Sequence, residues 1–391
     1  MPEPVAAYRL SLSPNTKGPA MSVPRRTTDR RSRVRLLLNL VATAALLLSL
    51  GACAQKPGEG GGGASGGGGG TAPAGGGPAS GGTVRMGVGG QPLLVYLPTT
   101  LAQQLGYYKE AGVDVQLDDL QGGSKALQAL QGGSVDVVSG FYDHTIQMAA
   151  KGKEVKAFVG MLQYPSVVLA VSPKAKKPIK TIKDLQGATV GVTAPGSSTD
   201  FFLKFLLRKN GLSPDAAPVV AIGGDATAVA AMENGKVDAA VMIDPSLSQL
   251  QKRVGKDKLV ILSDTRTAEG VQNAFGVSTY PAAVLYSTGD WINKNPDTAR
   301  KLAGAIQRTL TWIQGHSAEE IAAKMPPQYA GDDKSVYVAS IEAAKKAYSP
   351  DGKIHEDGAK EVLSVLKQSI PEVGSATIDL SKTYTNEYLG K

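Results

Sequence analysis

The sequence predicts an α/β protein built from two similar lobes. Short apolar runs with strand character alternate with amphipathic helical stretches, a pattern typical of parallel sheets covered by helices on both faces. The alternation occurs in two tracts, 83–140 and 188–243, whose motifs match each other. Hydrophobic residues make up 42% and charged residues 19% of the 391-residue chain, so a large core is expected.

In the first tract, turn residues mark where each predicted element begins or ends. Gly112 closes one helix and Ser124 opens the next. The predicted strands are 83–89, 113–119 and 135–140, and the predicted helices are 98–112 and 124–133.

The second tract repeats this plan. Its predicted strands are 188–194, 218–224 and 237–243, and its predicted helices are 198–211 and 225–235. Ala129-Leu130-x-x-Gly133-x-Val135-Asp136 recurs as Ala231-Met232-x-x-Gly235-x-Val237-Asp238. Gly122-Gly123-Ser124 likewise matches Gly223-Gly224-Asp225, but this earlier match lies one residue out of step with the later motif. The repeat therefore indicates a shared plan rather than a strict copy.

The remaining segments are predicted to connect and brace the lobes. Strands are expected at 156–162 and 166–173, the second leaving the first lobe, and 280–288 is expected to return to it. Amphipathic helices are predicted at 295–315, 317–325, 335–348 and 355–370. We expect this C-terminal part to support the first lobe rather than to bind a ligand.

The N-terminus has the parts of an export signal. A positive region, 25–35, precedes an apolar run of 15 residues, 36–50, which would rise only about 22 Å as a helix against a hydrocarbon core of about 30 Å. Leu50-Gly51-Ala52-Cys53 resembles the lipobox of bacterial lipoproteins, which implies lipidation of Cys53 and a signal peptide over 1–53. Met21 is an alternative start. An uncleaved anchor with a free Cys53 is the other interpretation, and Arg30-Arg31 leaves twin-arginine export open.

A glycine-rich segment and a nearly neutral body follow. Residues 54–82 contain 15 glycines and predict a flexible linker. The formal net charge of +8 is concentrated in residues 1–53, which carry eight basic and two acidic residues. The rest of the chain is close to neutral, so no nucleic-acid partner is expected.

Five segments together carry a family resemblance. They are LGYYKEAGVDVQL, GGSKALQALQGGSVDVVSG, TIKDLQGATVGVTAPGSSTDFFLKFLLRKNGL, ENGKVDAAVMIDPS and WINKNPDTARKLAGAI. They resemble the solute-binding proteins of ABC importers, of the nitrate/sulfonate/taurine and thiamine-precursor-like type, over about 83–315.

The resemblance implies a periplasmic-binding-protein type II fold, with two α/β lobes joined by two crossover strands and a ligand cleft between them. The expected lobe I is 83–172 with 279–391, and the expected lobe II is 173–278. The implied partners are a small-molecule ligand and an ABC permease with its ATPase. We expect a monomer, anchored by its lipid to the outer face of the cytoplasmic membrane.

Four loops follow predicted strands at the edge where α/β sheets bind ligands. Candidate ligand-binding residues in them are Gln91, Pro92, Phe141, Tyr142, Asp143 and Asp244, and Tyr164 and Tyr280, near the expected crossings between the lobes, could cover the cleft or pack the hinge. For most of these a structural role is the alternative: core packing for the aromatic residues, and helix capping for the two aspartates.

The turn TAPGSSTD, residues 193–200, is the sharpest candidate. Pro195 and Gly196 allow a tight turn, and Ser197 and Ser198 place hydroxyls beside free backbone N–H groups at a helix start. The combination predicts an anion site, and plain N-capping by Ser198 is the alternative.

Signatures of an enzyme are scarce. His144, His316 and His355 have no strong metal-ligand spacing, and no nucleophile elbow, P-loop or dinucleotide motif occurs. We therefore expect no cofactor, no metal and no catalysis. The predicted ligand is a small organic anion such as a sulfonate, taurine or nitrate. A pyrimidine-like thiamine precursor or aromatic compound is the alternative, and a menaquinone-pathway-like lyase or hydrolase of the same fold is the enzyme alternative.

Overall fold

A computed structural model describes residues 82–390 of the chain. The predicted signal peptide, Cys53 and all but the last residue of the predicted linker lie outside the described residues. Within the described part, no helix is both long and apolar enough to span a membrane.

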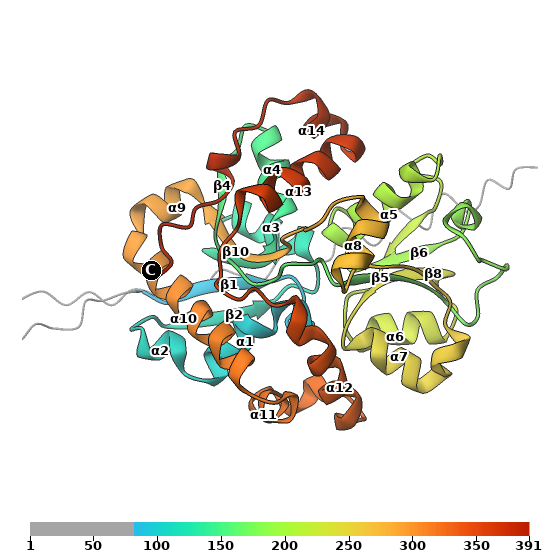
Figure 1. The fold of residues 1–391 in the computed structure, drawn as a ribbon, viewed down its shortest axis with the longest axis horizontal. Coiled ribbons are helices and arrows are strands. Elements are labelled where there is room, and N and C mark those ends of the chain that lie inside the picture. The colour runs from blue at the N-terminus through green and yellow to red at the C-terminus, as the bar shows by residue number, and fades with distance from the viewer. Residues whose placement is uncertain (1–81, 391) are drawn as a thin grey trace, which may run out of the picture. The chain divides into compact units, whose positions relative to one another are not determined.

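The described strands form two five-stranded sheets (Figure 1). The first has the order β2-β1-β3-β10-β4 and the second the order β7-β6-β8-β5-β9. The first sheet contains β1 (Val84–Val88), β2 (Val115–Asp119), β3 (Val137–Phe141), β4 (Val155–Gly160) and β10 (Ala283–Thr288). The second contains β5 (Val167–Val171), β6 (Val190–Val192), β7 (Val219–Ala221), β8 (Ala239–Ile243) and β9 (Ile261–Asp264).

The two sheets share one plan, as the sequence repeat predicts. In each sheet a fully buried central strand, β3 or β8, has a parallel neighbour on one side, β1 or β6, and an antiparallel neighbour on the other, β10 or β5. The matched aspartates make the same hydrogen bond in both lobes. Asp136 Oδ2 accepts from Arg85 N at 2.9 Å, and Asp238 Oδ2 accepts from Thr189 N at 2.9 Å. The repeated motif therefore fixes the start of a neighbouring parallel strand.

One predicted lobe boundary is wrong. The sequence places residues up to 172 in the first lobe, whereas β5 pairs with β8 and β9 in the second sheet. All five residues of β5 are buried, as an interior strand requires, so the apolar run belongs to the second sheet. The chain crosses between the sheets at 161–166, before β5, and returns between α8 and β10.

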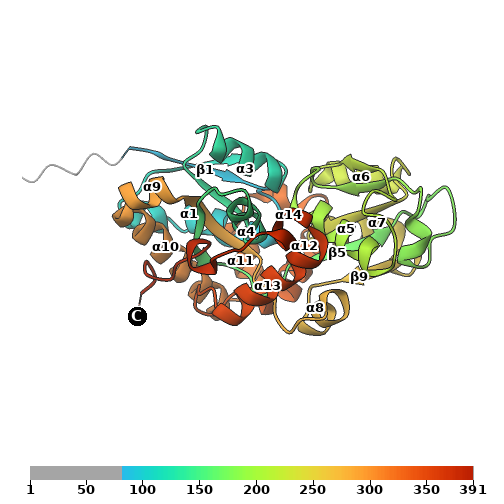
Figure 2. The same cartoon turned by 90° about the horizontal axis from the view of Figure 1, so that it is seen from above.

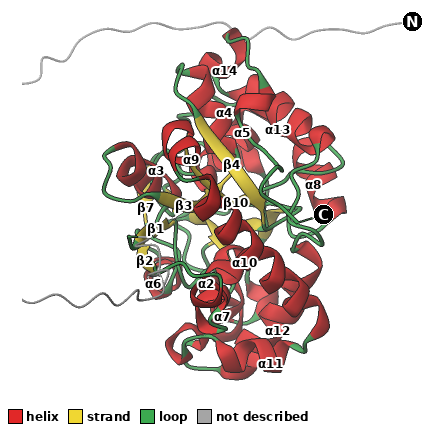
Figure 3. Ribbon diagram, turned by 90° about the vertical axis from the view of Figure 1, so that its left-hand side faces the viewer, coloured by secondary structure: helices red, strands yellow, loops and turns green. Residues whose placement is uncertain are grey.

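Helices surround the strands of each sheet (Figures 2 and 3). The first sheet has α1 (Leu97–Gln104), α2 (Tyr107–Glu110), α3 (Gly123–Gln131), α4 (Asp143–Ala150) and α9 (Gly289–Lys294). The second has α5 (Ser198–Lys209), α6 (Ala226–Glu233), α7 (Ser246–Val254) and α8 (Ala268–Phe275). The C-terminal helices are α10 (Pro296–Gly315), α11 (Ala318–Lys324), α12 (Lys334–Ala344), α13 (Glu356–Ser369) and α14 (Pro371–Ser375).

Candidate functional site

Loops predicted to bind ligand meet one another across the two lobes. Leu94 N, in the loop after β1, donates to Asp244 O, after β8, at 2.9 Å. Ser124 N, at the start of α3, donates to Ser197 Oγ, before α5, at 3.0 Å. The carboxyl ends of the strands in the two sheets therefore face each other, as the fold class predicts.

The turn 193–200 adopts the predicted tight geometry, with Gly196 at φ 79°. Some of its predicted anion-binding groups already have partners within the protein. Gly196 N donates to Asp200 Oδ2 at 2.7 Å, and the buried Ser197 hydroxyl contacts Ser124 of the other lobe. A carboxylate from the same helix thus already accepts from one backbone N–H of the turn, and the Ser197 hydroxyl joins the turn to the other lobe.

Asp143 and His144 form a second contact between the lobes. Asp143 Oδ1 accepts from Ser198 Oγ at 2.7 Å, while Asp143 Oδ2 and His144 Nε2 have no hydrogen-bond partner among the described residues. Burial raises the pKa of Asp143 and lowers the pKa of His144, because it disfavours the charged form of each. The lobes therefore close over two groups that prefer to be neutral.

A cavity of about 240 Å³ lies between the lobes, at the Leu94–Asp244 contact. Its lining comes from both lobes and from the C-terminal part: Leu94, Val95, Leu162, Ser166, Ile243, Asp244, Asp264, Arg266, Thr267, Ala343 and Ala344. Most of this surface is aliphatic, and the charged groups are confined to one wall. Such a lining suits a small solute with an apolar body and a polar edge.

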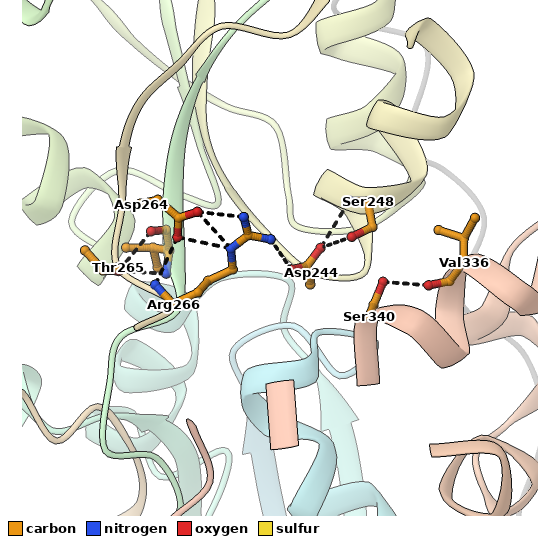
Figure 4. Close-up of polar contacts among 8 residues, drawn as sticks. Asp244, Ser248, Asp264, Thr265, Arg266, Val336 and Ser340 are labelled. Atoms are coloured by element: carbon orange, nitrogen blue, oxygen red, sulfur yellow. Dashed lines mark hydrogen bonds and ion pairs between the residues drawn. The ribbon is translucent and has the colours of Figure 1, made fainter. Parts of the chain in front are cut away.

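The charged wall is a hydrogen-bonded network centred on Arg266 (Figure 4). The guanidinium donates to Asp264 Oδ2 from Nη2 at 2.6 Å and to Asp244 Oδ2 from Nη1 at 3.0 Å. Asp244 Oδ1 also accepts from the backbone N and hydroxyl of Ser248 in the first turn of α7. Burial works to lower the pKa of Arg266, but the two carboxylates outweigh it and the pKa is raised.

Of the sequence-predicted ligand residues, Asp244 is the one that lines this cavity. Its predicted alternative role is also present, since it caps α7. Gln91 N donates to Asp119 Oδ1, and Pro92 is half-buried beside it.

The predicted aromatic residues make packing contacts in the structure, which is their predicted alternative role. Phe141 lies edge-on to Tyr96 at 6.1 Å between ring centroids, and Tyr280 stacks on Phe275 at 4.6 Å. The hydroxyl of Tyr142 shares a 2.6 Å hydrogen bond with Thr383 in the core of the first lobe. Tyr164 packs, half-buried, against the main core.

Sequence reasoning missed several residues that line the cavity. Arg266 and Thr267 follow β9, a strand that lies outside the two matched tracts. The apolar run that ends in Asp264 is the sequence feature that could have predicted this strand and the loop after it. Ala343 and Ala344, at the end of α12, bring the C-terminal part to the cavity wall as well. Figure 4 shows α12, with Ser340, opposite Asp244.

Comparison with known proteins identifies the family. The family described as NMT1/THI5 like matches residues 95–320, more than half of the chain. This chain belongs to the NMT1/THI5-like family. YtlA of Bacillus subtilis, named as a binding protein, is 23% identical over 283 residues, which are 71% of this chain and 80% of YtlA.

Solved structures show the fold of this NMT1/THI5-like chain. A structure from Bordetella bronchiseptica RB50 has 41% sequence identity and a TM-score of 0.73, covering 78% of this chain and 95% of that one. The alkanesulfonate-binding protein SsuA from Xanthomonas axonopodis pv. citri, bound to MOPS, has a TM-score of 0.61 at 16% identity, covering 79% of this chain and 99% of SsuA. The chain thus has the type II fold of the periplasmic binding proteins.

Proposed function

We propose that this chain is an exported, lipid-anchored substrate-binding protein of an ABC importer that captures a small organic solute between its lobes. The observation that carries the proposal is the interlobe cavity, which is lined by Leu94 and Val95 from one lobe and by Asp244 and Arg266 from the other. Its volume of about 240 Å³ is below the roughly 300–1,000 Å³ typical of drug-sized sites. The solute is accordingly a small molecule.

The charge of the cavity favours the alternative ligand named from the sequence, a pyrimidine-like or aromatic compound. The compound should carry an amino group. Two carboxylates surround one guanidinium, so the wall carries a formal excess of one negative charge. An amino or protonated ring nitrogen can donate to Asp264 or Asp244, while the ring contacts aliphatic side chains such as Leu162 and Ile243.

An organic anion, the class that the sequence favours, is the second candidate because Arg266 lies on the wall. That guanidinium is already paired with both carboxylates, and in the predicted anion turn Asp200 already accepts from Gly196 N. An anion would have to displace at least one of these carboxylates, which costs it the electrostatic gain of binding.

Lobe closure is the proposed basis of transport. The contacts Leu94–Asp244, Ser124–Ser197 and Asp143–Ser198 hold the lobes together around the cavity. A solute touching both lobes binds the closed state more tightly and raises its population, and the permease can then distinguish loaded from empty protein.

A ligand screen tests this proposal. Thermal unfolding of the purified chain is measured with aminopyrimidines, aromatic amines, aryl and alkyl sulfonates, taurine, nitrate and aromatic carboxylates. A ligand present at 100 times its Kd adds about 2.7 kcal/mol of stability. Stabilisation by the amino-bearing ring compounds supports the proposal, stabilisation by sulfonates alone favours the anion candidate, and turnover of the compound would favour an enzyme.

Export and anchoring are tested separately. Cys53→Ala removes the acceptor of the lipid, so the chain should no longer partition into detergent as a lipoprotein does, and metabolic labelling with a fatty acid should be lost. Unchanged labelling in Cys53→Ala would contradict the lipobox interpretation.

A further inference from the structure

A second large hollow lies on the first lobe, away from the interlobe cavity. Its floor is a face of α10 that presents Arg300, Gly304, Arg308 and Trp312 at intervals of four residues, and its volume is about 790 Å³. Tyr107 of α2 and the C-terminal residues from Tyr388 to Gly390 form its walls. Figures 1 and 3 show α2 beside α10. We name this hollow the α10 groove.

The α10 groove combines basic and aromatic side chains. Arg308 lies 4.0 Å above the ring of Tyr107, and Arg300 lies 5.8 Å from the ring centroid of Tyr388. Arg308 also pairs with Glu110 and Arg300 with Asp297, whereas Lys301 has no ion pair among the described residues. Trp312 is half-buried beside them. Tyrosine, tryptophan and snorkelling basic residues are the side chains favoured at a membrane–water interface.

The groove lies next to the point where the N-terminal part joins the folded body. Thr83 Oγ1 donates to Asp114 Oδ2 at 2.6 Å, and the nearby Gly112 lies beside Lys301, whose Nζ is 3.7 Å from the position of a Cβ at Gly112. Residues 54–81 separate this point from Cys53. The glycine-rich composition of these residues predicts a linker with a root-mean-square reach of about 30 Å, and on that prediction a lipid on Cys53 is expected to keep the groove within reach of the bilayer.

We propose that the α10 groove rests on an anionic phospholipid surface while the protein is held by its lipid. The proposal depends on the lipid anchoring of Cys53 proposed above. The basic residues attract the anionic headgroups, and the half-buried Trp312 and Tyr107 sit at headgroup depth. The interlobe cavity, lined by other elements, stays free to take up solute.

The test uses the full lipidated chain on vesicles and the fluorescence of Trp312. The other of the two tryptophans is Trp291, and Trp291→Phe leaves Trp312 as the single reporter. On vesicles of phosphatidylcholine with 30% brominated phosphatidylglycerol, we expect at least twofold quenching of Trp312. Salt at 0.5 M, where the Debye length is about 4 Å, should reverse most of it while the chain stays bound.

Matched variants separate the groove from the anchor. Arg300→Gln with Arg308→Gln should abolish the quenching and leave vesicle sedimentation unchanged, and the same quenching in this variant would overturn the proposal. Lys236→Gln with Lys256→Gln, which removes two exposed charges from the second lobe, should leave the quenching intact.

Three further outcomes would overturn the proposal. An unquenched Trp312 in a chain that sediments with vesicles rules out the groove as the lipid-facing surface while keeping the anchoring. A chain that stays in the supernatant rules out the anchoring and, with it, the proposal. The third outcome is measured without vesicles, by acrylamide quenching of Trp312. If this quenching weakens as the protein concentration rises, the groove is covered by a second copy of the chain.

Discussion

The turn 193–200 and the network around Arg266 both place polar groups of the second lobe beside the first, yet they differ in what those groups have left to offer. In the turn, Gly196 N donates to Asp200, and Ser197 is taken up by Ser124. In the network, Arg266 is paired too, but its two carboxylates keep acceptor capacity on the wall of the interlobe cavity. A motif of donors thus predicts an anion site only when those donors lack an internal acceptor, whereas two carboxylates that share one guanidinium can still accept from a solute.

The largest expected effect comes from removing the centre of the network. Arg266→Ala leaves Asp244, whose side chain is 8% exposed, without its counter-charge, and we expect a loss of about 2–3 kcal/mol in the free energy of unfolding. Urea unfolding measures it. The matched control is Arg253→Ala: Arg253 also pairs with two carboxylates, but at the surface, so the change should stay within about 1 kcal/mol. Equal losses in the two variants would show that the cavity network is no different from a surface ion pair.

The next effect concerns closure at the turn. A Cβ at Gly122 would lie 2.8 Å from Cβ of Ala194 in the other lobe, and the φ of 176° at Gly122 allows any residue, so Gly122→Ala tests space alone. We expect the overlap to disfavour the closed state by about 1–3 kcal/mol and to weaken solute binding five- to a hundredfold. Small-angle scattering should show a larger radius of gyration. Gly315→Ala, with open space around the new methyl group, is the control. Unchanged binding in Gly122→Ala would mean that closure does not require this contact.

A smaller effect is expected from pH. Burial lowers the pKa of His144 in the folded state below its ordinary value of 6.5, so the unfolded chain binds the proton more readily. The contribution of the neutral His144 to the free energy of unfolding is therefore fully present above about pH 6.5, and it is lost as the pH falls through the folded-state pKa. Thermal unfolding between pH 7.5 and 5 should show this loss, and His144→Gln should flatten it. The exposed His355→Gln is the control, and an equally steep profile in His144→Gln would assign the loss to other groups.

The smallest effect is expected from removing the internal carboxylate at the turn 193–200. Asp200→Ala frees Gly196 N and removes the internal carboxylate, so the helix start becomes able to bind an anion. Millimolar sulfate should then raise the Tm of Asp200→Ala by a degree or two more than that of the wild type. Equal responses would indicate that the turn binds no anion even when it is empty.

Local patterns in the sequence were enough to predict the two-lobed α/β architecture. The recurrence of Val-Asp after a glycine-terminated helix marks a strand start in each lobe, and the structure gives Asp136 and Asp238 the same role there. The loops predicted to face the cleft do meet, as the Leu94–Asp244 and Ser124–Ser197 contacts show.

The cavity wall could not be predicted in this way because it depends on non-local packing. Arg266 reaches Asp244 only because β9 pairs with β5, a strand that the sequence assigns to the other lobe. Ala344 reaches the cavity from a helix far along the chain. The sequence shows which donors the turn 193–200 contains, but not that Asp200 satisfies one of them.

The most direct test of the account is a calorimetric titration of 4-aminopyrimidine, or the closest amino-bearing compound found by the screen, into matched variants. The account predicts that Asp264→Asn weakens binding at least tenfold, because the cavity loses a charged acceptor, and that Asp200→Asn leaves the Kd unchanged. Loss of binding in Asp200→Asn together with an unchanged Kd in Asp264→Asn would move the site from the cavity to the turn and contradict the account.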